Sequence, residues 1–376
     1  MKVANPFIVG RYVGDEYFCD RVEETAFLEK QVTNGRDVTI ISPRRMGKSG
    51  LIKHFFNKDS IKENYETLFV DIYATATLGE LVAHLGCALL EKIAARKSVF
   101  MKALDVVKSL RPMLTWDAMS GEPSVELTVG KIVRPELTLD EIFQYFEQSE
   151  KTFIVAFDEF QQIMKYDSDT VEGRLRTLMQ RCVKTRFIFA GSEQSLMTEM
   201  FQSSRKPFYQ TTIAMSLHPL DRNVYCEFAC RLFKERGKSV EPVLVSRVYE
   251  EMEGVTWFVQ MLMNEIFAIT PENGAPSDDA LHAAMVNIIG VQTENYQELM
   301  ARLSARQRQL LCAIAAEPQV GREPTSAASL ELSGFKTAAM VQSALRALLK
   351  EGLVTKTAAG YSVYDKFLHR WLRGGV

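Results

Sequence analysis

The feature that most constrains the fold of this chain is a glycine–lysine–serine loop between an expected strand and an expected helix. Residues 42–50 read SPRRMGKSG, after the apolar segment Asp37–Ser42 and before the helical pattern Lys48–Asn57. In the motif G-x-x-x-x-G-K-[ST], backbone N–H groups and a helix N-terminus converge on phosphate oxygens. The setting therefore predicts a phosphate-binding loop, whose residues are Ser42, Pro43, Arg44, Arg45, Met46, Gly47, Lys48, Ser49 and Gly50.

Three positions of this loop have separate expected roles. We expect Lys48 to reach the β- and γ-phosphates of a nucleotide and the Ser49 hydroxyl to coordinate Mg²⁺. Ser42 stands where the motif has its first glycine, so the turn there departs from the motif. The two loop arginines have two interpretations: contact with phosphate or a neighbouring chain, or solvated ion pairs of little energetic value. The alternative for the whole segment is a basic, solvated loop.

A pair of carboxylates follows the apolar segment Thr152–Phe157. Ligands of open α/β sheets bind at the C-terminal edge of the strands, where Asp158 and Glu159 are expected to lie. We expect Asp158 to hold Mg²⁺, through water, and Glu159 to polarise an attacking water as general base. The alternative is a strand that ends at a solvated turn.

A third polar position follows the apolar segment Thr185–Ala190. Ser192 is expected at the tip of the strand next to the Asp-Glu strand, where its hydroxyl can bond a γ-phosphate or the attacking water. Gly-Ser after a strand is also ordinary turn chemistry. The candidate catalytic residues are thus Glu159, Lys48 and Ser192, and the candidate metal ligands are Ser49 and Asp158.

The rest of the N-terminal part alternates short apolar runs with helical patterns. Two further runs, Thr67–Ala74 and Thr211–Leu217, bring the expected strands to five, and near-continuous apolarity indicates burial on both faces. This alternation predicts an α/β fold with a parallel sheet. Residues 111–136, rich in Pro and Gly, are expected to form an inserted loop or β-hairpin.

The C-terminal residues form a unit of their own. The segments Leu303–Ala316, Ala327–Leu332 and Lys336–Glu351 have helical patterns, and two short strands and a last helix follow. Three helices and a hairpin are a winged helix. In the third helix Val341, Leu345, Leu348 and Leu349 recur on one side, and the other side carries Lys336, Ser343, Arg346 and Lys350.

That polar side has three open interpretations. It can contact DNA phosphates or base edges in a major groove, or it is only the solvated face of an amphipathic helix. Winged helices within ATPases also serve as packing or protein-interaction modules. Charge is distributed accordingly: the net charge is −2, but residues 301–376 carry +6 and residues 1–300 carry −8.

Composition excludes several classes of protein. Of 376 residues 47% are hydrophobic and 24% charged, which excludes a disordered chain, a small disulfide scaffold and collagen. No run approaches the ~18 apolar residues of a spanning helix, and the start lacks a signal-peptide core. Six scattered cysteines without a CxxC pair are typical of a reducing compartment. We therefore expect a cytoplasmic protein without a membrane partner.

The segments SPRRMGKS, FIVAFDEF, FIFAGSE and YFCDRVEE resemble the archaeal-type ATPase family, in the STAND branch of AAA+-like P-loop ATPases. The resemblance runs from about Pro6 to Val376. It implies ATP or ADP as nucleotide, a sheet with the Asp-Glu strand between the phosphate-loop strand and its neighbour, a helical lid and a C-terminal winged helix. It also implies that Phe18–Glu24 lies near the adenine.

The expected organisation is a P-loop ATPase core over residues 1–217, a helical lid over 218–300 and a winged helix over 301–376. Three hypotheses of function follow. The first is a Mg²⁺-dependent ATPase that couples the nucleotide state to movement of the lid and winged helix. The second is a nucleotide-gated switch with slow or no turnover, in which bound ADP or ATP sets the angle between core, lid and winged helix. The third is a DNA-binding regulator, and the alternative partner of the winged helix is a protein.

Overall fold

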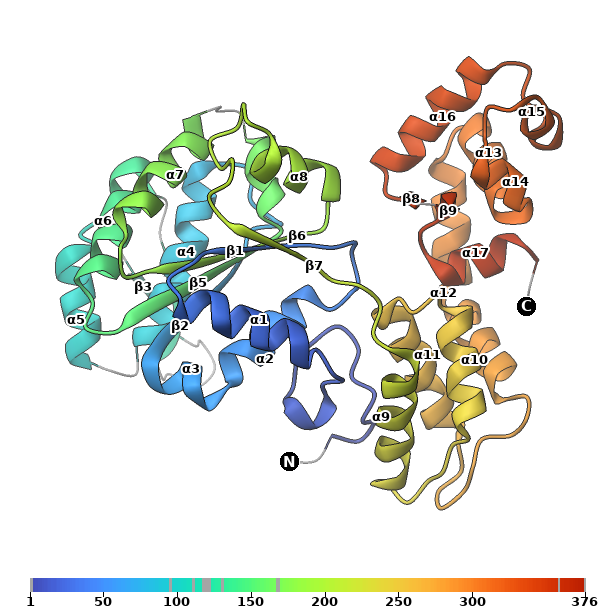
Figure 1. Cartoon of the computed structure of the whole chain (residues 1–376), viewed down its shortest axis with the longest axis horizontal. Coiled ribbons are helices and arrows are strands. Elements are labelled where there is room, and N and C mark those ends of the chain that lie inside the picture. Colours follow the sequence, from blue (N-terminus) through green and yellow to red (C-terminus); the bar gives the residue numbers. More distant parts are fainter. Residues whose placement is uncertain are drawn as a thin grey trace. The chain divides into compact units, whose positions relative to one another are not determined.

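The computed structural model describes residues 3–94, 97–109, 112–116, 123–129, 132–166, 170–357 and 359–374. Their contacts divide the chain into two compact units. The first unit is Gly10–Leu220, and the second is Asp221–Val376 together with the N-terminal segment up to Val9. Figure 1 shows the elements of each unit. In the described part of the chain, no helix combines the length and apolarity needed to span a membrane.

A five-stranded parallel sheet forms the centre of the first unit, with the strand order β2-β5-β6-β1-β7. Each strand falls within or beside one of the five apolar runs of the sequence. The strands are β1 (Val38–Ile41), β2 (Tyr65–Asp71), β5 (Thr152–Asp158), β6 (Arg186–Gly191) and β7 (Ile213–Ser216). The expected α/β fold with a parallel sheet is thus confirmed.

One implication of the resemblance is wrong: the Asp-Glu strand β5 does not lie beside the phosphate-loop strand β1. Strand β6 separates them, because it pairs with β5 along one edge and with β1 along the other. Residues of β6 alternate between the two hydrophobic clusters of the unit, Phe187 and Phe189 on one face and Ile188 and Ala190 on the other. A strand that is apolar on both faces suits this central place.

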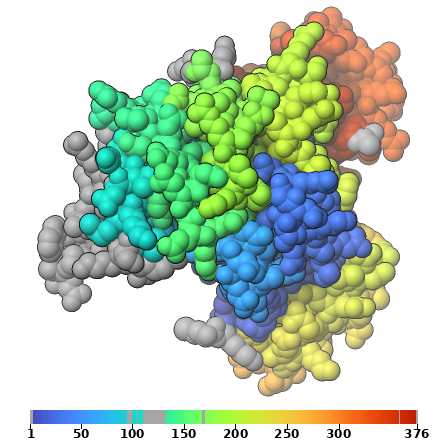
Figure 2. Space-filling view, turned by 60° about the vertical axis from the view of Figure 1, so that its left-hand side comes forward, coloured from blue at the N-terminus to red at the C-terminus, as the bar shows by residue number. Residues whose placement is uncertain are grey.

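Helices cover both faces of the sheet (Figure 1). One hydrophobic cluster joins the sheet to the first three helices, and the other joins the opposite face to the remaining five. The space-filling view shows the cyan-to-green helices of the second group side by side on one outer face (Figure 2). The helices are α1 (Val22–Thr33), α2 (Lys48–Asn57), α3 (Asp59–Asn64), α4 (Leu78–Ile93), α5 (Lys97–Val106), α6 (Pro135–Gln148), α7 (Thr170–Arg181) and α8 (Gln194–Gln202).

Strands β3 (Pro112–Trp116) and β4 (Pro123–Val129) pair antiparallel between α5 and α6. They form the hairpin that was one of the two alternatives for residues 111–136. The remaining residues of that predicted insertion up to residue 131 lie outside the described ones.

The second unit contains four helices followed by a winged helix. The four are α9 (Arg222–Lys234), α10 (Pro242–Glu251), α11 (Thr256–Ile269) and α12 (Ala280–Arg302). The winged helix consists of α13 (Ala305–Ala316), α14 (Pro318–Arg322), α15 (Ala327–Ser333), α16 (Ala338–Lys350), β8 (Val354–Thr357), β9 (Gly360–Val363) and α17 (Lys366–Leu372). Short helix α14 is an addition to the predicted pattern.

The N-terminal segment packs in this second unit, although the sequence pattern predicted that it belongs to the core. Phe7 is fully buried, and its ring lies 5.5 Å from that of Phe233 and 6.0 Å from that of Phe267. Asn5 Nδ2 donates to the Asn264 carbonyl (2.9 Å), and Asn264 Nδ2 donates to the Phe7 carbonyl (2.7 Å). The segment belongs to the second unit because the aromatic ring of Phe7 is buried between α9 and α11, a contact that the local sequence does not indicate.

Candidate functional site

The phosphate loop turns directly into α2. Gly47 caps this helix with φ of 92°, a left-handed conformation that favours glycine, and an added Cβ there would meet no atom within 4 Å. The backbone at Gly47 is therefore open to a ligand. The first N–H groups of α2 have no partner within the helix, so they are available to an anion.

Lys48 lies under this loop, with 5% of its surface exposed. Its ammonium donates to the carbonyls of Ser42 (3.1 Å) and Pro43 (3.0 Å), so the side chain folds back across the loop. Burial lowers the pKa of Lys48, and Arg44 acts in the same direction, whereas the Glu159 carboxylate acts against both. A phosphate in the loop would compensate the buried positive charge.

Ser49 and Asp158 join the loop to the end of β5. The Ser49 hydroxyl donates to Oδ2 of Asp158, whose side chain is 4% exposed. Burial raises the pKa of Asp158, as do the nearby carboxylates of Glu159 and Asp71, while the hydrogen bond from Ser49 and the charge of Lys48 oppose this. The fold therefore brings together two side chains that are 109 residues apart in the sequence.

Glu159 follows Asp158 but turns to other partners. Its φ of 56° is left-handed, which redirects the chain into the short 3-10 helix Phe160–Lys165. Oε2 of Glu159 accepts hydrogen bonds from Ser192 Oγ at 2.5 Å and from Gln161 Nε2 at 2.6 Å. The candidate base and the candidate sensor thus contact one another directly.

One of the remaining loop residues, Met46, is held from outside the loop. Arg44 is exposed and Arg45 is half-buried with φ of 64°. Buried Arg21 donates to the Met46 carbonyl (3.2 Å) and pairs with Glu24 at 2.5 Å. The segment for which the resemblance implied a place near adenine therefore supports the phosphate loop.

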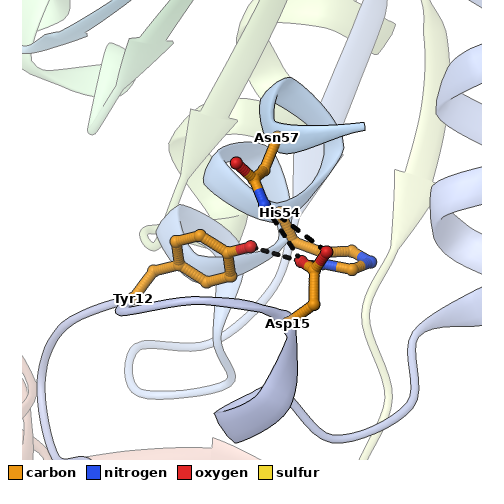
Figure 3. Close-up of polar contacts among 4 residues, drawn as sticks. All are labelled: Tyr12, Asp15, His54 and Asn57. Carbon is orange, nitrogen blue, oxygen red and sulfur yellow. Dashed lines mark hydrogen bonds and ion pairs between the residues drawn. The ribbon is translucent and has the colours of Figure 1, made fainter. Parts of the chain in front are cut away.

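A polar cluster fixes the preceding segment to the far end of α2 (Figure 3). Tyr12 donates to Asp15 Oδ1 (2.5 Å), and the same oxygen lies 2.8 Å from His54 Nδ1 and 3.4 Å from Asn57 Nδ2. The ring of Phe18 stacks on His54 with 4.4 Å between centroids. The bond from Tyr12 lowers the pKa of Asp15, with His54 and Asn57 in the same direction. Burial raises the pKa of Tyr12.

Three features of this site were missed from sequence. Gln161 bonds the candidate base, Asp71 lies near Asp158 at the end of the next strand, and the cluster of Figure 3 orders the N-terminal segment. Only the position of Asp71, a carboxylate within the apolar run Thr67–Ala74, offered a signal. Gln161 lies two residues from Glu159, a spacing without meaning until the 3-10 helix is known.

Ser49 and Asp158 provide the hydroxyl and carboxylate that Mg²⁺ takes in nucleotide sites, where phosphates and water complete the shell. Among the residues that the structure describes, no group of three or more His, Cys, Asp and Glu could hold a metal by itself. These residues therefore fit Mg²⁺ that arrives with a nucleotide, and not a metal bound by protein alone.

The candidate DNA-contacting residues are all exposed on the winged helix: Lys336, Ser343, Arg346 and Lys350. Lys336 precedes α16 instead of starting it, because the Thr337 side chain accepts from Met340 N and caps the helix. Leu349, expected in the apolar stripe, is 36% exposed.

Three solved structures of other proteins resemble this chain in fold. Among solved structures, the Walker-type ATPase of Pyrococcus abyssi is 21% identical with a TM-score of 0.61, covering 98% of this chain and 99% of its own. The ORC2 protein of Aeropyrum pernix, solved as ADPNP-ADP complexes, is 14% identical with a TM-score of 0.58 over 98% and 96%. The ORC1 protein of that organism, in complex with DNA, is 11% identical with a TM-score of 0.53 over 95% and 92%.

At these identities the likeness shows the fold alone. No curated protein matches the sequence. The sequence model of a probable winged helix domain matches residues 294–374. The sequence model of an ATPase domain predominantly from Archaea matches residues 18–262, which include the phosphate loop, Asp158, Glu159 and Ser192. The chain belongs to this family of ATPase domains, and a winged helix follows its ATPase domain.

Proposed function

We propose that this chain binds ATP and hydrolyses it with Mg²⁺, within the STAND branch of its fold group. The observation that carries the proposal is the convergence of Lys48, the Ser49–Asp158 pair and Glu159 at one edge of the sheet. A cation, a metal-binding pair and a carboxylate are the parts that phosphoryl transfer to water uses.

In this proposal Lys48 moves from the Ser42 and Pro43 carbonyls to the β- and γ-phosphates. Ser49 and Asp158 hold Mg²⁺, which supplies neutralisation of the phosphate charge when bound. Glu159 orients a water and accepts its proton as the water oxygen bonds the γ-phosphorus and the bond to the ADP oxygen breaks. Ser192 is the sensor, since its hydroxyl lies at the carboxylate of the base.

The test is phosphate release from Mg·ATP by the wild type and by Glu159→Gln, with ATP affinity measured for both. The proposal expects turnover in the wild type, a loss of at least about 100-fold in the variant, and similar ATP affinity. Equal phosphate release by the two proteins would reject hydrolysis at this site. Retained nucleotide without turnover in the wild type would favour the nucleotide-gated switch.

We propose three functional parts: a core over residues 10–217, a lid over 218–300 and a winged helix over 301–376, with the nucleotide state moving the last two. Small-angle scattering with ADP and with a non-hydrolysable ATP analogue measures this. Different scattering profiles are expected for the wild type and identical ones for Lys48→Ala; identical wild-type profiles would reject the coupling. A reducing compartment such as the cytoplasm suits six scattered cysteines without a CxxC pair.

A second candidate function is DNA binding by the winged helix. It is favoured by the exposed cations Lys336, Arg346 and Lys350, and by the likeness in fold to an ORC1 protein solved with DNA. Duplex binding should weaken with salt and with replacement of these three residues by Ala. Replacement of Arg231, Lys234 and Arg247 on α9 and α10 is the matched control. Absence of binding at low salt would remove this function.

A further inference from the structure

Gln161 is a buried side chain that the proposed chemistry leaves without a role. It is 1% exposed, and its Nε2 donates to Glu159 Oε2 at 2.6 Å. The 3-10 helix brings the two side chains together because Glu159 starts it in a left-handed conformation. The contact is local, and the Gln162 N–H bond to the Glu159 carbonyl (2.9 Å) fixes the backbone that carries it.

The glutamine amide is held from the other side by the end of β6. A Cβ added to Gly191 would lie 2.5 Å from Gln161 Oε1 and 2.4 Å from Met197 Cγ. Gln161 therefore fills the space that the absent side chain leaves, and Met197 lies beside it. An amide confined in this way has little freedom to leave Glu159.

The two donors to Glu159 meet the same oxygen. Ser192 Oγ and Gln161 Nε2 both reach Oε2. With Oε2 engaged and its plane fixed by two bonds, Oε1 is the oxygen whose lone pairs remain for a water. A general base must present a lone pair in a defined direction, and two donors on its other oxygen define that direction.

Packing alone does not account for a glutamine here. Its Oε1 is buried and has no hydrogen-bond partner among the residues that the structure describes. An unpartnered buried oxygen costs about 1–3 kcal/mol, and an apolar side chain of similar volume avoids that cost. The favourable contribution of the residue is therefore its donor, which goes to Glu159.

We infer that Gln161 is the positioning residue of the general base: its amide, packed on Gly191, fixes the carboxylate of Glu159 so that Oε1 faces the attacking water. The inference rests on the proposed role of Glu159. In this inference Gln161 acts through the carboxylate of Glu159, to which its amide donates.

The test is Gln161→Met, which keeps the shape of the side chain and removes the donor. We expect kcat for ATP to fall about 10- to 100-fold, less than for Glu159→Gln, with KM and ATP affinity within twofold of the wild type. Thermal stability should be equal or higher, because the unpartnered oxygen is gone. Gln161→Leu serves as a second variant if the first does not fold.

Gln162→Met is the matched control. Gln162 is the next residue and donates to the Thr75 carbonyl (3.0 Å), not to Glu159, so its loss should leave kcat unchanged. An unchanged or raised kcat in Gln161→Met, or an effect carried by KM, would overturn the inference. So would an equal fall in kcat for both glutamine variants.

A double variant separates this inference from the proposed function. If Glu159 is the base, Gln161→Met should cause no further loss in a Glu159→Gln background. If Glu159→Gln itself retains full turnover, the proposed function fails first. If Glu159→Gln loses turnover and Gln161→Met does not, only the role of Gln161 fails.

Discussion

At the scale of single residues, adjacent carboxylates have different partners because the backbone turns between them. Asp158 ends β5 in extended conformation and bonds Ser49, whereas Glu159 has φ of 56° and bonds Ser192 and Gln161. A non-glycine residue in this region costs on the order of 1–3 kcal/mol. Such strain is frequent at functional sites, and here it separates the metal-binding role proposed for Asp158 from the proton-accepting role proposed for Glu159.

Asp37, at the opposite end of β1 from the phosphate loop, leads to a prediction about pH. It accepts from the Phe187 N–H at 2.8 Å, and burial raises its pKa to about 6, opposed by that bond and by Arg186. The fold therefore favours the protonated form. The contribution of Asp37 to the free energy of unfolding should be greatest below the unfolded pKa of about 4 and should fall as the pH rises through 6.

Asp37→Asn keeps an acceptor for Phe187 and should remove this fall, a difference of roughly 1–3 kcal/mol at pH 7. Urea denaturation of both proteins at pH 4, 5, 6 and 7 measures it. Glu272→Gln, at an exposed carboxylate, is the control and should follow the wild type. Parallel pH curves for the wild type and Asp37→Asn would contradict the prediction.

At the scale of elements, the candidate nucleotide site lies at the edge of the sheet where the parallel strands have their carboxyl ends. β1, β5 and β6 run parallel, so Ser42, Asp158 and Ser192 follow their carboxyl ends at the same side of the sheet. Helix α2 begins there, and its other end holds the N-terminal segment through His54 and Asn57 (Figure 3). One helix therefore connects the phosphate loop to the segment before α1.

The cluster of Figure 3 should keep that segment ordered. His54→Ala removes the ring under Phe18 and a partner of Asp15, so amides 12–18 should exchange with solvent about 5- to 10-fold faster. His282→Ala, an exposed histidine on α12, is the control and should leave these amides unchanged. Equal protection in wild type and His54→Ala would show that the cluster does not hold the segment.

Strands and the phosphate loop were predictable from the sequence because a local pattern of residues determines each of them. Apolar runs located the five strands, and the phosphate loop was located by its spacing before a helix. The order of parallel strands was not predictable, because crossover connections allow β6 to insert between β5 and β1. Gln161 was missed because its contact depends on a left-handed residue and on Gly191, neither of which follows from periodicity.

At the scale of the whole molecule, both ends of the chain belong to the second unit. The residues between them, Gly10–Leu220, form the first unit with its sheet. Residues up to Val9 pack with the helices after Asp221, so the first unit is connected to the second at both of its ends. Sequence reasoning placed this segment in the core, since nothing local links Phe7 to Phe233 and Phe267. Contacts across more than 200 residues leave no periodic signal.

Phe7→Ala should destabilise the second unit. Loss of a fully buried aromatic side chain costs about 3–5 kcal/mol. Denaturation followed by tryptophan fluorescence in a Trp116→Phe background measures this, because Trp257 and Trp371 lie in that unit and Trp116 lies in the first. Val13→Ala, at a residue 44% exposed, is the control. A midpoint for Phe7→Ala equal to that of the wild type would contradict the assignment of the segment.

Titration calorimetry of Mg·ATP into the wild type and into Lys48→Ala tests whether the loop Ser42–Gly50 is the nucleotide site of the molecule. Lys48 is buried in the loop, and its ammonium is the charge proposed to bind the phosphates. We expect binding to the wild type with one site per chain, and a loss of at least about 100-fold in affinity for Lys48→Ala. Full affinity in Lys48→Ala would show that the nucleotide does not bind at this loop.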